Sequence, residues 1–126
     1  MDFRVESNMR LNNVHSLVST CQRVYFYPHQ FPRIKTLEVC GCSCDNINFI
    51  GTNLLLLIDT IEICIIRMCP RFTLDGLRNI NLAMGSLRRN FTLYLESSMY
   101  KSFQRQLQQP DSDFIPHIKI VELLTT

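Results

Sequence analysis

Two short stretches of the chain carry almost the same pattern of side chains, and this repeat constrains the fold more than any other feature. Residues 34–40 read IKTLEVC and residues 58–64 read IDTIEIC, an offset of 24 residues. Thr, Glu and Cys recur at equivalent positions, and the other apolar positions exchange one aliphatic side chain for another. Apolar and polar residues alternate in each copy, which predicts β-strands with one apolar and one polar face. Looser echoes begin at Asn90 and Ile115.

Segments with helical spacing lie between these echoes. Thr73 and the pair Ser97 and Ser98 are good helix N-caps, and Gly85 and Pro110 are suitable ends. The apolar positions of the two expected helices are Leu74, Leu77 and Ile80, then Met99, Phe103 and Leu107. Strand-helix units that recur with a period of about 20–29 residues are typical of solenoids. The sequence therefore predicts an α/β fold, a short arc of parallel strand-helix units.

The first copy also fits a family pattern, L-x-x-L-x-L-x-x-N/C-x-L. The three aliphatic places are Ile34, Leu37 and Val39, Cys42 takes the N/C place, and Cys44 takes the last apolar place. The stretch resembles a cysteine-type leucine-rich repeat, as found in the substrate-recognition regions of F-box proteins. With the offset of 24, the second unit has Ile66 at the N/C place. The third unit has Asn90 at its first apolar place and Ser98 at its N/C place.

The 126 residues are enough for one domain and too few for two. We expect residues 1–33 to form an N-terminal cap and residues 34–126 to form irregular strand-helix repeats. The aromatic segment VYFYPHQF, at 24–31, is predicted to cover the open end of the repeat core, and the alternative is an anchor for a partner.

The resemblance implies a non-catalytic protein-protein interaction module that recognises substrates in a ubiquitin-ligase adaptor. An F-box itself is not recognised, because the chain has no Trp and its N-terminal segment is too brief. Solenoids use their concave strand face for recognition. We therefore expect the polar face of the strands to bind a protein partner through Lys35, Glu38, Asp59, Glu62 and Tyr94.

A second contact is predicted at the C-terminal strand-like segment, residues 118–124. With no helix after it, the strand would lie at the edge of the sheet with unpaired backbone groups. Such an edge favours dimerisation or addition to a partner's sheet. We expect a homodimer or partner docking through Ile118, Ile120 and Val121, and the alternative is an internal strand.

The six cysteines and three histidines leave two interpretations open. The favoured one is structural, since free cysteine is among the most buried residue types. The alternative is a zinc site built from Cys40 and Cys44 with Cys64, Cys69 or His29. On that alternative the protein is a small metal-binding or viral-type accessory regulator that acts on host partners.

Other functional classes find no support in the sequence. It contains no Gly-rich phosphate loop, paired-acid motif or serine elbow, so we expect no enzyme and no cofactor. A net charge of +2 with scattered basic residues does not favour nucleic acid. The apolar run at 54–66 is too short for a membrane span and contains Asp59 and Glu62. Without a signal peptide, the expected location is cytoplasmic or nuclear.

Overall fold

The computed structural model contains five strands and three helices. It describes residues 10–20, 25–41, 48–70, 72–85, 87, 90–107 and 118–124. In chain order the elements are β1 (Ser16–Ser19), β2 (Thr36–Cys40), α1 (Asn48–Leu56), β3 (Ile63–Arg67), α2 (Leu74–Met84), β4 (Thr92–Glu96), α3 (Ser97–Leu107) and β5 (Lys119–Leu123).

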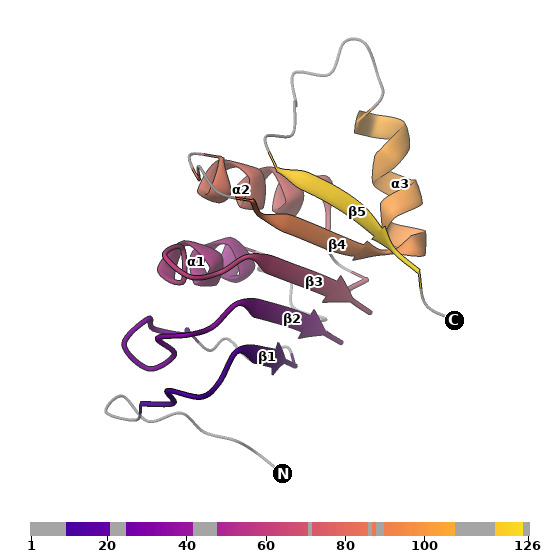
Figure 1. Cartoon of the computed structure of the whole chain (residues 1–126). Coiled ribbons are helices and arrows are strands. Elements are labelled where there is room, and N and C mark those ends of the chain that lie inside the picture. Colours follow the sequence, from indigo (N-terminus) through magenta and orange to yellow (C-terminus); the bar gives the residue numbers. More distant parts are fainter. Residues whose placement is uncertain are drawn as a thin grey trace.

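The strands form one sheet in chain order, β1-β2-β3-β4-β5, and every neighbouring pair is parallel. Figure 1 shows the strands stacked from β1 to β5, with α1 and α2 near one end of the strands and α3 at the carboxyl ends of β4 and β5. Parallel neighbours require crossover connections, and α1, α2 and α3 supply three of the four. The prediction of an α/β arrangement of parallel strand-helix units is confirmed.

Alternation along the strands separates a buried face from an open one. In β2, β3 and β4 the second and fourth residues are buried, and the others are partly exposed. The inward residues share one core with α1 and α2, whose buried members include Ile50, Leu54, Leu77 and Ile80. The helices α1 and α2 also pack against each other. One face of the sheet is therefore covered by helices.

An aromatic segment replaces a helix in the connection from β1 to β2. Phe26 and Phe31 are buried, and their rings meet edge to face with centroids 5.7 Å apart. The backbone N–H of Phe26 donates to Oδ1 of the buried Asn53 in α1 at 2.8 Å. This segment covers the core beside α1, as a cap would, whereas Tyr25 and Tyr27 stay exposed. It does so within the sheet, because β1 precedes it.

The strand register corrects the offset of 24 residues. Leu37 pairs with Cys64 and Val39 with Ile66, which is an offset of 27. The expected strand at 58–64 is wrong for its first part, since residues 57–60 form a turn after α1 and β3 begins at Ile63. As a result Ile63 lies on the open face, and Cys64 enters the core.

The corrected register also changes the residue at the N/C place of the second unit. It is Cys69, equivalent to Cys42 by the same offset, and not Ile66, which is fully buried in β3. The Cys69 thiol donates to the carbonyls of Arg67 at 3.1 Å and Val39 at 3.8 Å. This is the thiol-to-carbonyl role expected of Cys42, which lies outside the described residues together with Cys44.

The predicted helices form where expected. Helix α2 begins after Thr73, whose side chain makes no capping hydrogen bond, and it ends before Gly85. Helix α3 starts directly at Ser97, without a loop after β4. The Ser97 hydroxyl donates to the carbonyl of Leu123 at 3.3 Å, which ties α3 to β5. Pro110 lies outside the described residues.

A left-handed turn follows β2 and recurs after β3. Gly41 has a φ of 73°, and Met68, its equivalent by the offset of 27, has a φ of 51°. Left-handed backbone suits glycine and costs other residues about 1–2 kcal/mol. The same turn is therefore relaxed after β2 and strained after β3.

Exchanging side chains at these turns should change stability in opposite directions. A Cβ at Gly41 meets no atom within 4 Å, so Gly41→Ala tests the backbone alone and should lower the free energy of unfolding by about 1 kcal/mol. Met68→Gly should raise it by about 0.5–1 kcal/mol, because strain is released while glycine also loosens the unfolded chain. Urea unfolding followed by circular dichroism measures both.

The helical Gly51 provides the control for these turns. Its added Cβ would lie 3.6 Å from the Asn79 carbonyl oxygen, an ordinary contact, so Gly51→Ala should not destabilise the protein. Equal destabilisation by Gly41→Ala and Gly51→Ala would contradict the left-handed turn.

Candidate functional site

The open face of the sheet brings one side chain from each strand into a central row. Consecutive register pairs link the row across all five strands. Its members are Val18, Glu38, Ile65, Tyr94 and Val121. Val18 is 61% exposed, and the other four are partly exposed. Figure 1 shows how the five strands lie side by side to carry this row. We call these five residues the central row.

Two ion pairs cross neighbouring strands on the same side of the sheet. Lys35 Nζ lies 3.5 Å from Glu62 Oε1, just before β2 and β3. Both side chains are about half exposed, so this pair contributes little to stability. Arg67 Nε lies 3.4 Å from Glu38 Oε1, and these two side chains are more buried, at 35% and 22% exposure. The charges flank an otherwise apolar centre.

The structure unites most of the predicted partner-binding residues. Lys35, Glu38 and Glu62 take part in the two ion pairs, and Tyr94 lies in the central row. Asp59 is different, because it lies in the turn after α1 and not on a strand. It is exposed there, away from the central row.

Sequence reasoning missed Ile63, Ile65 and Arg67 on this face. The offset of 24 residues assigned Ile63 to the core, and it did not extend the strand as far as Arg67. The signal was present in the spacing from Cys42 to Cys69, which matches the true offset of 27.

The C-terminal strand β5 forms an edge of the sheet, as expected. Ile118 is buried, and Ile120 aligns with the inward Leu93 and packs against the core. Of the three predicted docking residues, Val121 alone lies on the open face, beside Tyr94. Docking at this edge would therefore use backbone groups, and it stays a prediction.

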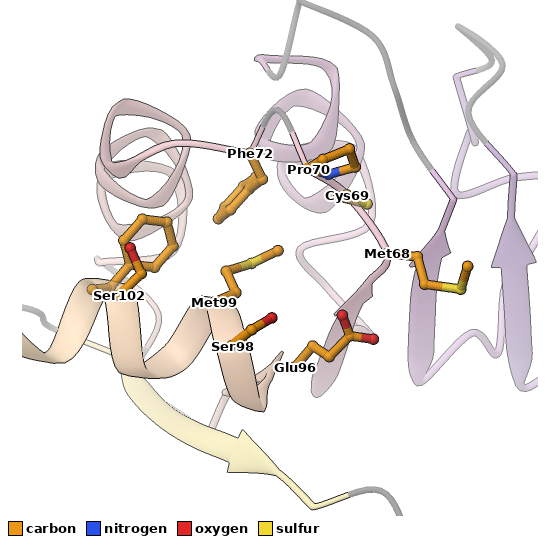
Figure 2. Close-up of a pocket in the computed structure, with 9 residues that line it drawn as sticks. Met68, Cys69, Pro70, Phe72, Glu96, Ser98, Met99 and Ser102 are labelled. Carbon is orange, nitrogen blue, oxygen red and sulfur yellow. The ribbon is translucent and has the colours of Figure 1, made fainter.

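A pocket of about 500 Å³ opens where β3 and β4 end. Met68 and Phe72 line it from the segment after β3, and Glu96, Met99 and Phe103 line it from β4 and α3. Figure 2 shows the labelled side chains around the pocket, with Glu96 and Met99 on the α3 side. Because Glu96 ends β4, the pocket adjoins the open face of the sheet.

The described cysteines lie in different environments. Cys40 is partly exposed at the end of β2, whereas Cys64 and Cys69 are buried. Cys64 faces the core and Cys40 the open face, so these two sulfurs lie on opposite sides of the sheet. Burial raises the pKa of the Cys64 thiol, and nearby Cys69 raises this pKa further. Cys64 therefore stays protonated and is a poor nucleophile.

Within the described part of the chain, no group of three or more His, Cys, Asp or Glu residues is arranged to hold a metal ion. Cys44 lies outside that part, so the predicted zinc alternative stays untested. The described helices also include none with the length and apolar composition needed to cross a bilayer.

Comparisons of the chain with models of protein families, with curated proteins and with solved structures give no match.

Cysteine alkylation should follow burial. In the folded protein Cys40 should react with iodoacetamide well before Cys64 and Cys69, because it is the exposed member of the three and Cys64 stays protonated. Fragment-ion mass spectrometry of the digested protein gives the extent of reaction at each position. Labelling in urea is the control, where the three should react alike. Native labelling of Cys64 as fast as Cys40 would contradict the assigned face of β3.

Proposed function

We propose that this chain is a non-catalytic protein-protein interaction module that binds a protein partner on the open face of its sheet. The central row carries the proposal, because its side chains lie side by side on a face that no described helix covers. An uncovered apolar surface rimmed by polar residues is typical of an interaction site.

The chemistry of this face suits a protein ligand. Tyr94 lies near its centre between Ile65 and Val121, and tyrosine contributes strongly to binding when it lies at the centre of an interface. The Lys35–Glu62 pair lies toward the amino ends of the strands, and Arg67 and Glu38 lie toward the carboxyl ends. An apolar centre with charged surroundings matches the usual anatomy of a protein interface.

The register supports the leucine-rich-repeat interpretation within this proposal. With the offset of 27, the second unit places Ile61, Cys64 and Ile66 at the aliphatic positions and Cys69 at the N/C position. Two successive units then share a cysteine at the same place. Substrate recognition in a ubiquitin-ligase adaptor is the narrower function that this resemblance implies, and it stays a prediction.

Photo-crosslinking tests the proposal at the centre of the face. Replacing Tyr94 with p-benzoylphenylalanine keeps an aromatic ring and adds a reactive carbonyl at the proposed interface. On irradiation in cells, position 94 should give a discrete protein adduct that is lost when Ile65→Arg is added, because the new charge blocks the neighbouring apolar contact. Mass spectrometry identifies the adduct.

Two control positions for the photo-crosslinker make the test specific. Leu82 on α2 is 77% exposed and lies outside the central row, and Tyr27 tests the aromatic segment as an alternative anchor. We expect no equivalent adduct from either position. The same adduct from position 82, or one from position 27 alone, would refute binding on the open face.

A further inference from the structure

The pocket at the carboxyl ends of β3 and β4 combines apolar walls with one acidic group. Phe72 and Phe103 lie with ring centroids 5.9 Å apart in an edge-to-face arrangement. Met68 and Met99 supply flexible thioether side chains, and Met68 is 63% exposed. Methionine adapts its shape to an incoming group and packs well against aromatic rings. These walls fit an elongated ligand with an apolar stem.

The acidic group is Glu96, which lines the pocket beside Met99 (Figure 2). Among the described residues it has no recorded hydrogen bond or ion pair. Extending the β3–β4 register places it next to Arg67, but the Arg67 guanidinium is already paired with Glu38 at 3.4 Å. Two carboxylates thus share one guanidinium, which leaves one negative charge unmatched.

We infer that this pocket receives an arginine side chain of the protein partner. The inference rests on the proposed function and deepens it, since it names a chemical feature of the partner that lies on the open face. The aliphatic stem would pack between Met68 and Met99, and the guanidinium would reach the Glu96 carboxylate. Its positive charge balances the unmatched negative charge.

Arginine fits this site better than lysine does. Its planar guanidinium is weakly hydrated, stacks on aromatic rings such as Phe72, and can form two parallel hydrogen bonds with a carboxylate. A lysine ammonium is a compact, strongly hydrated group that gains less from an apolar pocket. The volume of about 500 Å³ falls within the range of ordinary ligand pockets.

Methionine-methyl NMR tests this inference directly. The full-length protein carries ¹³C-methyl methionine and is titrated with N-acetyl-L-arginine amide. The methyl signals of Met68 and Met99 should shift and saturate, while the signal of the buried Met84 should stay unchanged. The uncharged isostere N-acetyl-L-citrulline amide should bind about tenfold more weakly or worse, because it lacks the charge-assisted bond.

Matched protein variants locate the charge that binds. Glu96→Gln should weaken binding of the arginine compound about tenfold or more, whereas Glu62→Gln should leave it unchanged, since Glu62 pairs with Lys35 outside the pocket. Equal binding of arginine and citrulline compounds, stronger binding of the lysine analogue, or no effect of Glu96→Gln would overturn the inference. Failure of the Met68 and Met99 signals to shift would overturn it too.

The two proposals fail in different ways. If the arginine compound does not bind while crosslinking from position 94 succeeds, the pocket assignment is wrong and the open-face interaction stands. If the compound binds but position 94 gives no adduct, the arginine pocket stands as a binding site and the open-face function is wrong.

Discussion

The parallel pairing of β2 with β3 sets which side chains enter the core and which face outward. Hydrogen bonds fix this pairing at both ends. The Lys35 carbonyl accepts the N–H groups of Glu62 at 2.8 Å and Ile63 at 3.0 Å, and the Gly41 N–H donates to the Arg67 carbonyl at 3.0 Å. A slip by one residue would exchange the two faces of β3, and the charged Arg67 would then enter the core. The fully buried Ile66 holds the strand against that change.

Both proposed binding features depend on this register. It places Ile65 between Glu38 and Tyr94, which makes the centre of the open face continuous. It also brings Arg67 to Glu38, so that Glu96 on the next strand keeps its negative charge available. Because α3 follows β4 without a loop, Glu96 and Met99 come to line the same pocket. The pocket and the open face therefore form one connected surface.

The sequence predicted some of these features for clear physical reasons and missed others. Helices α2 and α3 were predictable because their apolar spacing and flanking residues agree. The face of β3 was not, since four consecutive residues from Ile63 to Ile66 are apolar and either alternation can be buried. Strand β1 has only four residues and was hidden in the expected cap. The pocket depends on the meeting of two distant segments, which no local pattern reveals.

The register of β3 on the open face is the central claim, and the nuclear Overhauser contacts of Ile65 test it most directly. The structure predicts contacts from the Ile65 side chain to Glu38 and to the Tyr94 ring, its register neighbours on β2 and β4. Contacts from Ile65 to the buried Leu54 of α1 or Leu77 of α2 would instead place it in the core and contradict the account.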